Sequence, residues 1–496
     1  MFSLTPNYQQ ATLQNLPETI QQVNELPRKN PVKFLQLLNE HIDLPTLIPA
    51  SFYLSYNYSQ TNTRDYSLES ILAVLLLMQF FKFANVSNFI TLLALSPLVR
   101  DFCRLPEGCV PDESVVSKFK IRFENELRLF FENLTLPVMD IFDEYDDSLP
   151  NDSLDKGKNK IEIYDTTGLE PKVKENNPKF VESEVKRQSS YKKYLESQGK
   201  GQNFNAYAAA YKNLPKHASA NEAIRLGYAN GHFGYFYKFG TVSNGFGTPL
   251  HIHFLGKDFY DQLPADFDTP EDQKYIYDNA SLHPVLSSFH KRVGPGRFDT
   301  FLGDSEFDSY DNYGFLNELG FKKVLIPLND RNSLPSNDPI PINASGIPCC
   351  PKDPTQTFIA NGRCKGKNRS LRFKFVCPKS LRIGDKWQSL CPDKCRPTNS
   401  TVTTYTYPSS DLRVYSGVLR GSIDWVDTYK IRSVIERGFS SMKSHPALCH
   451  PNTYNCASMR ADVYLNAASK LITVMLAFAL GKPQFMRNLN KLLNAA

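Results

Sequence analysis

The chain has 496 residues and a mass of 56.4 kDa, more than one hydrophobic core usually organises, which favours two or three domains or one core with large insertions. Hydrophobic residues at 41% and charged residues at 22% exclude a globally disordered chain. The net charge of +6 is modest, but residues 363–396 carry eleven Lys and Arg against two Asp, and residues 429–496 carry nine against Glu436 and Asp462, which favours a polyanionic partner over ordinary solvated surfaces.

The first part of the chain is expected to be polar and then helical. Residues 1–68 are rich in Asn, Gln and Pro, with one helical stretch near 31–42. Apolar runs at 71–77 and 89–98 predict two helices, and a further helix is expected to begin at Pro111-Asp112-Glu113. Helices joined by a short glycine-containing turn are compatible with a DNA-binding module in which Lys118 contacts DNA. A helical scaffold with solvated lysines fits the same pattern.

A change of pattern follows the acidic run at 143–160, which has the composition of a linker. Alternating or apolar segments predict strands, whereas two later segments have helical periodicity. The predicted strands are 161–165, 233–239, 250–255, 299–303 and 323–327, and the predicted helices are 310–319 and 426–442. Strands followed by strand and helix alternation indicate a mixed α/β sheet. His251 and His253 are interpreted as sheet residues.

No signal for export is expected from this sequence. The N-terminus lacks a basic region followed by an apolar core. The two most apolar stretches, 71–81 and 471–480, are too short to span a bilayer and are predicted to be core helices. The expected location is therefore cytoplasmic, with no membrane partner. The ten cysteines are then expected to be thiols or metal ligands rather than disulfides.

Three acidic positions carry the chemistry that the sequence suggests. Asp165 and Asp304 each stand at the end of a predicted strand, where a carboxylate is commonly just a turn or cap residue. In the helix predicted at 426–442, Tyr429, Arg432 and Glu436, followed by Lys443, fall on one stripe about 60° wide. Apolar side chains occupy mainly the opposite side, so the helix can bury one face and present a carboxylate flanked by two cations.

The spacing Tyr429-x2-Arg432-x3-Glu436-x6-Lys443 resembles the C-terminal signature of the insertion-sequence-four transposase family. The segments around Asp165 and Asp304 resemble the first and second acidic motifs of that family, and the resemblance covers about residues 69–480. Asp299, Glu306 and Asp308 compete for the second position, but the family motif places the acid at Asp304. Membership implies a ribonuclease H-like fold interrupted by an insertion before the last acidic helix.

The function implied by this resemblance is DNA transposition by a DDE enzyme. Asp165, Asp304 and Glu436 would be the catalytic residues and would bind two Mg²⁺ or Mn²⁺ ions, since hard oxygen donors suit these cations. Tyr429, Arg432 and Lys443 would contact DNA. The alternatives are a domesticated or inactive DNA-binding descendant, and a ribonuclease H-like nuclease without strand transfer.

The expected partners are the terminal inverted repeats of a mobile element and target DNA, with a homodimer on the paired ends in the nucleoid of a prokaryote. The expected domain organisation has five segments. These are a polar segment at 1–68, a helical and DNA-binding region at 69–155, the first part of the ribonuclease H-like core at 156–345, a basic cysteine-rich β insertion at 346–415, and the last core helices with a basic tail at 416–496.

The predicted insertion combines positive charge with six cysteines. Arg369 and Arg372 lie in segments expected to form hairpins and to contact the DNA backbone. Two interpretations of the cysteines stay open. In one, Cys350, Cys377, Cys391 and Cys395 hold a structural zinc ion, and in the other they are buried or free thiols, because their spacing departs from common zinc patterns.

Overall fold

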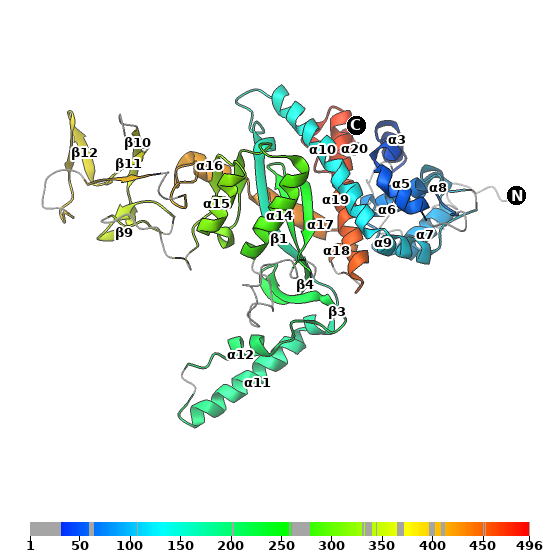
Figure 1. The fold of residues 1–496 in the computed structure, drawn as a ribbon, viewed down its shortest axis with the longest axis horizontal. Coiled ribbons are helices and arrows are strands. Elements are labelled where there is room, and N and C mark those ends of the chain that lie inside the picture. The colour runs from blue at the N-terminus through cyan, green and yellow to red at the C-terminus, as the bar shows by residue number, and fades with distance from the viewer. Residues whose placement is uncertain are drawn as a thin grey trace.

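The computed structural model describes residues 31–58, 64–106, 108–200, 203–256, 259, 278–329, 332, 340–343, 345–364, 372–395, 402–407, 412–449, 451 and 453–495. A central sheet lies between a group of N-terminal helices and a strand-rich segment at the opposite end of the molecule, and a pair of helices, α11 and α12, projects to one side (Figure 1). Helices and strands are both extensive, in agreement with the predicted mixed α/β class.

The N-terminal region is helical, and polar caps begin several of its helices. Ser67, Asn85 and Asp112 each accept a hydrogen bond from a backbone N–H in the first turn of the helix that follows. The helices are α3 (Pro31–His41), α4 (Leu44–Leu47), α5 (Ala50–Asn57), α6 (Leu68–Phe80), α7 (Val86–Leu95), α8 (Pro97–Phe102), α9 (Glu113–Arg122) and α10 (Glu124–Ser148). The helices expected near 31–42, 71–77 and 89–98 and after Pro111 are confirmed.

The helix α10 corrects the predicted linker at 143–160. Asp143 to Asp147 belong to this helix, which ends only at Ser148. Apolar side chains that recur every three or four residues, such as Phe131, Leu134 and Phe142, bury one face of α10 and carry the helix through the acidic run. Acidic composition alone therefore concealed an amphipathic helix.

The strands of the central sheet are β1 (Ile161–Leu169), β2 (His217–Ala218), β3 (Asn221–Ala229), β4 (His232–Asn244), β5 (Pro249–Phe254), β6 (Thr300–Leu302) and β7 (Lys323–Leu325). Their order is β2-β3-β4-β1-β6-β7, and β5 also pairs with β4. The sheet is mixed, because β1 is antiparallel to β4 but parallel to β6, and β6 is parallel to β7. The first half of β4 pairs with β3 and its second half with β5.

Four predicted strands match β4, β5, β6 and β7, whereas β1 is longer than expected. Sequence analysis also missed the strands β2 and β3 and three helices, the projecting α11 (Pro178–Ser197) and α12 (Ala206–Asn213) and α14 (Asp278–Val293), which packs on the sheet. Short 3-10 turns occur at Lys158–Lys160, Lys174–Asn176, Ser305–Phe307 and Pro483–Phe485, and α15 (Tyr310–Glu318) follows the third of them, as predicted.

The C-terminal part contains α16 (Ile423–Lys430), α17 (Ser433–Lys443), α18 (Pro446–Cys449), α19 (Cys456–Ala479) and α20 (Leu489–Ala495). The single helix predicted at 426–442 is wrong, since α16 and α17 are separated at Ile431 and Arg432. The backbone N–H groups of these two residues bond to carbonyls three residues earlier, which tightens the helix for one turn. The chain stays helical in direction through this turn, so side chains of α16 and α17 still lie on a common side.

The described residues of the segment that was predicted as an insertion form seven short strands. They are β8 (Cys349–Cys350), β9 (Asp353–Thr357), β10 (Ile359–Cys364), β11 (Arg372–Val376), β12 (Ser380–Ile383), β13 (Lys386–Ser389) and β14 (Thr403–Thr406). They form one three-stranded and two two-stranded sheets. A small hydrophobic cluster that includes Phe358, Phe373 and Phe375 packs this segment.

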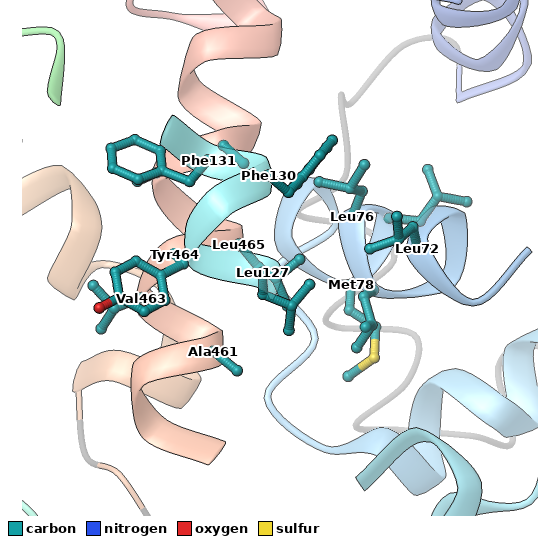
Figure 2. Close-up of a cluster of buried hydrophobic side chains, with 14 of the residues drawn as sticks. Leu72, Leu76, Met78, Leu127, Phe130, Phe131, Ala461, Val463, Tyr464 and Leu465 are labelled. Carbon is teal, nitrogen blue, oxygen red and sulfur yellow. The ribbon is translucent and has the colours of Figure 1, made fainter. Parts of the chain in front are cut away.

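The largest hydrophobic cluster joins the two ends of the chain. Leu72 and Leu76 of α6, Leu127 and Phe130 of α10, and Leu465 of α19 lie in this cluster (Figure 2). Among the described helices, α19 is the one long and apolar enough to cross a membrane, but 78% of its most apolar window is buried inside the protein. It is therefore accounted for as the core helix that the sequence predicted for residues 461–480.

Candidate active site

Two neighbouring parallel strands bring Asp165 and Asp304 together. The register of β1 and β6 aligns Ile163 with Leu302, and each aspartate lies two residues further along its own strand direction. Asp165 is not at the end of its strand as predicted, because β1 stays paired with β4 as far as Leu169. Asp304 does follow the end of β6, where its carboxylate caps the 3-10 turn that begins at Ser305.

Arg432, in the turn between α16 and α17, binds both aspartates. Its guanidinium donates hydrogen bonds from Nη1 to Asp165 Oδ2 over 2.9 Å and from Nη2 to Asp304 Oδ2 over 2.8 Å. The same Nη2 lies 3.1 Å from Oε1 of Glu436, one turn further along the chain. The three carboxylates thus converge on one guanidinium, although they come from β1, from the loop after β6 and from α17.

Burial and charge act in opposite directions at this cluster. Burial raises the pKa of the Asp165 carboxyl to about 6, although the guanidinium of Arg432 and the backbone N–H of Thr166 favour the ionised form. Burial works against the charge of Arg432, but the carboxylates of Asp165 and Asp304 outweigh it, so the pKa of Arg432 lies above its ordinary value. Arg432 therefore stays a cation and neutralises part of the carboxylate charge.

Tyr429 and Lys443 border the carboxylates. The hydroxyl of Tyr429 accepts a hydrogen bond from Arg432 Nε over 3.2 Å, and its ring stacks on Trp425 at a centroid distance of 4.9 Å. Lys443 donates to Thr167 Oγ1 over 2.6 Å and also bonds the side chain of Asn230. Burial lowers the pKa of Lys443 to about 8. Glu436 is exposed, and Tyr429, Arg432 and Glu436 of the predicted stripe meet at one cluster, whereas Lys443 contacts Thr167 and Asn230 instead.

Asp278 is a fourth carboxylate near the cluster, and the sequence analysis missed it. It begins α14, accepts a hydrogen bond from Thr166 Oγ1 over 2.7 Å and pairs with Lys238. Its negative charge contributes to the raised pKa of Asp165. No local sequence pattern marks Asp278, because its position depends on how α14 packs against β1 and β4.

The competing carboxylates have structural partners. Asp308 is buried and forms an ion pair of 2.7 Å with Arg413, which also donates from Nε over 3.0 Å. Asp299 accepts a hydrogen bond from Thr300 Oγ1, and its backbone carbonyl bonds Lys322 and Lys323. Asp304 is the carboxylate of this group that contacts Arg432, in agreement with the choice made from the sequence.

The remaining predicted DNA contacts are scattered. Lys118 is exposed on α9, a helix that packs against α19, whereas its neighbour Lys120 is buried in an ion pair of 2.9 Å with Asp462. Arg372 lies on β11, with its guanidinium 4.1 Å from the ring centroid of Tyr405. Arg369 lies outside the described residues. Of the described side chains among them, Lys118 and Arg372 do not join the carboxylate cluster.

Of the four cysteines assigned to a zinc site, two approach each other. The Sγ atoms of Cys350 and Cys395 are 3.9 Å apart, while Cys391 donates to the backbone carbonyl of Asp393 and Cys377 is buried in the small cluster of this segment. None of the ten cysteines, all of which lie in the described part of the chain, forms a disulfide. Structural zinc stays a prediction, which metal analysis of the purified protein would test.

A divalent cation suits the donor atoms of Asp165, Asp304 and Glu436, because all are carboxylate oxygens. Within the described residues, no three His, Cys, Asp or Glu side chains stand in an arrangement that could hold a metal ion as they are. At the carboxylate cluster the reason is visible, since the guanidinium of Arg432 lies between the three acids. The donor set fits a cation that takes the place of this guanidinium.

Comparison with known proteins gives one match. Residues 22–122 match a family model described as a transposase domain (DUF772). No curated protein and no solved structure matches the chain. The matched segment includes the helices α3 to α9 and ends before the carboxylate cluster. The N-terminal region of the chain is therefore similar to a transposase domain.

Proposed function

We propose that this protein is a DDE transposase of the insertion-sequence-four type that moves a DNA element by cut-and-paste transposition. The observation that carries the proposal is the convergence of Asp165, Asp304 and Glu436 on one cationic group. Three carboxylates from separate elements repel one another when they are brought together. A cation bound between them relieves this repulsion, so the cluster favours cation binding. The match of the N-terminal region to a transposase domain supports DNA as the substrate class.

The proposed reaction has two steps of the same kind. Water attacks a phosphodiester at the end of the element and releases a 3′-hydroxyl, which then attacks a phosphodiester of the target DNA and displaces a second 3′-hydroxyl. Mg²⁺ or Mn²⁺, held by Asp165, Asp304 and Glu436, would supply activation of the attacking oxygen and stabilisation of the leaving oxygen. No covalent link between protein and DNA is needed.

The cations around the carboxylates have defined roles in this proposal. Arg432, once released from the acids, is close enough to bind a phosphate of the scissile strand through its planar guanidinium. Lys443 is held by Thr167 and Asn230, so its ammonium has a fixed position for a neighbouring phosphate. The stacked pair of Trp425 and Tyr429 offers an aromatic edge beside the same phosphates.

Substitution of each acid by its amide tests the proposal. Asp165→Asn, Asp304→Asn and Glu436→Gln should each abolish Mg²⁺-dependent cleavage of element ends while duplex binding changes less than about tenfold, because only the charge of a metal ligand is lost. The matched control is Glu306→Gln, which removes a nearby exposed carboxylate. Wild-type cleavage by any one of the three variants would exclude that residue from the catalytic set.

Two other functions remain to be separated from transposition. A ribonuclease H-like nuclease would cut the same ends but would form no joined products with target DNA. A domesticated or inactive descendant would bind DNA and cut nothing. An assay that scores binding, cleavage and joining on one substrate distinguishes all three, and short inverted repeats beside the gene would identify that substrate.

A further inference from the structure

A second cationic site lies behind the helix that carries Glu436. A partly open cavity of about 470 Å³ is bounded by the end of α6, the turn between β4 and β5, α17, α19 and the segment that leads into α20. Successive residues of a helix point about 100° apart, and Arg437 of α17 accordingly turns into this cavity while Glu436 faces the carboxylate cluster. The cavity is thus separate from the candidate active site.

Four cationic side chains line the cavity, and they come from four distant parts of the sequence. They are Lys82, Arg437, Lys470 and Arg487. The described lining residues include no Asp or Glu. Within the described part of the chain, none of these four cations forms an ion pair with a carboxylate. The nearest acids are engaged elsewhere, since Asp155 pairs with Lys158 and Asp462 with Lys120.

Neutral hydrogen bonds hold the two lysines in place. Lys470 Nζ donates to Ser441 Oγ over 2.7 Å, and Lys82 Nζ donates to Ser444 Oγ over 3.2 Å. Burial, together with the positive charge of Lys82, lowers the pKa of Lys470 to about 8. Lys82 also adopts a left-handed backbone with φ of 54°, a conformation that is costly for lysine. The four positive charges therefore repel one another across the cavity.

The geometry points to a phosphate-binding site in this cavity, formed by Lys82, Arg437, Lys470 and Arg487. Cations gathered without counter-charges in a partly enclosed cavity favour a multiply charged anion, and the serine hydroxyls and lysine ammonium groups supply donors for phosphate oxygens. Two sources carry this chemistry. One is the backbone of DNA that extends past the active site, and the other is a small di- or triphosphate.

The first arm of the test uses inorganic pyrophosphate without divalent cations, at constant ionic strength. Thermal unfolding of the wild-type protein should shift to higher temperature with a saturable dependence on pyrophosphate, because a ligand that binds only the folded state stabilises it. The double variant Lys82→Gln and Lys470→Gln should lose this shift. The control, Lys291→Gln with Lys322→Gln, removes the same charge from exposed positions outside the cavity and should keep it.

The second arm measures binding of a short DNA duplex of random sequence at several salt concentrations. If the cavity holds backbone phosphates, the slope of log K against log salt should fall by about 0.9 for each phosphate that the cavity variant no longer neutralises, and by less in the control. Arg437→Gln, at an exposed position, should reduce the slope in the same direction.

Each combination of results decides the proposal. Loss of the pyrophosphate shift in the cavity variants alone supports the small phosphate, and a reduced salt slope in them alone supports DNA. The proposal is overturned if neither readout changes, or if the control changes both as much as the cavity variants do. Since Asp165→Asn leaves this cavity intact, failure of the proposed transposition chemistry would not affect either arm.

Discussion

Arg432 occupies the position that a metal ion is proposed to take, and this has consequences for single residues. Its guanidinium satisfies three carboxylates that would otherwise repel one another in a partly buried site. In the proposed reaction, divalent cations would have to compete with this resident counter-ion. The Arg432 side chain would then be released beside the carboxylates, where a phosphate could accept its hydrogen bonds.

Replacement of Arg432 by Gln should destabilise the protein by about 3 kcal/mol in the absence of divalent cations, because it leaves three acids without their cation. Added Mn²⁺ should raise the melting temperature of this variant more than that of the wild-type protein. Differential scanning fluorimetry with and without Mn²⁺ measures both effects. An equal metal response in the two proteins would contradict competition between Arg432 and the metal.

His445 gives a prediction for pH. It is buried, Nε2 faces the backbone carbonyl of Met78 at 3.3 Å, and burial lowers its pKa from 6.5 to about 4 despite the influence of Asp462. Lys82 and Lys470 add to the lowering. Below pH 6.5, His445 binds a proton in the unfolded chain but stays neutral in the folded protein. Its contribution should therefore lower the free energy of unfolding by about 3 kcal/mol as the pH drops from 6.5 to 4. His445→Gln should flatten this part of the stability profile in urea denaturation.

At the scale of elements, the position of α17 depends on its contact with the turn between β4 and β5. Gly247 in this turn has φ of 76°, and a Cβ atom there would lie 2.8 Å from the backbone oxygen of Val434. The contact fixes the position of α17, and with it the position of Glu436 in the carboxylate cluster on one side of the helix and of the cationic cavity on the other.

Gly247→Ala should therefore lower the free energy of unfolding by about 1 to 3 kcal/mol and reduce cleavage by displacing Glu436. Gly314→Ala is the matched control, because Gly314 lies in α15 with an ordinary helical φ, and an added Cβ there would meet no described neighbour within 4 Å. The control should be neutral or slightly stabilising. Chemical denaturation and the cleavage assay together would reveal whether the turn positions the helix.

Elements with clear periodicity could be predicted from the sequence, and contacts between distant elements could not. The strand pattern before Asp165 and Asp304 and the helical pattern around Glu436 predict elements that the structure contains, although β1 continues past Asp165 and two helices replace the one predicted. The pairing of Arg432 with all three acids depends on the parallel register of β1 and β6, which no local pattern contains. Asp278 could not be predicted from the sequence for the same reason. The cavity could not be predicted either, because its cations are spread from position 82 to position 487.

At the scale of the whole molecule, one hydrophobic cluster links the transposase-like helices to the end of the chain. Its buried members range from Phe34 to Leu493, and α19 packs against both α6 and α10. The N-terminal helices therefore share their stability with the elements that hold the carboxylates and do not form an independent core.

Leu471→Ala tests this shared stability. Leu471 is fully buried in α19, so its truncation should cost about 3 kcal/mol. The substitution should lower the unfolding transition of the N-terminal helices and of the central sheet together, as followed by hydrogen exchange. Leu154→Ala, at a side chain that is 92% exposed, should have little effect. Separate transitions for the two regions would contradict a common core.

The placement of α19 also bears on how the protein is made. A ribosome releases α6 and α10 hundreds of residues before it releases the helix that covers them. The early helices must wait with apolar surface uncovered until synthesis is almost complete, a state that attracts chaperones and favours aggregation. A frameshift or stop codon upstream of α19 would consequently impair folding of the N-terminal helices as well, since the truncated product would lack the helix against which they pack.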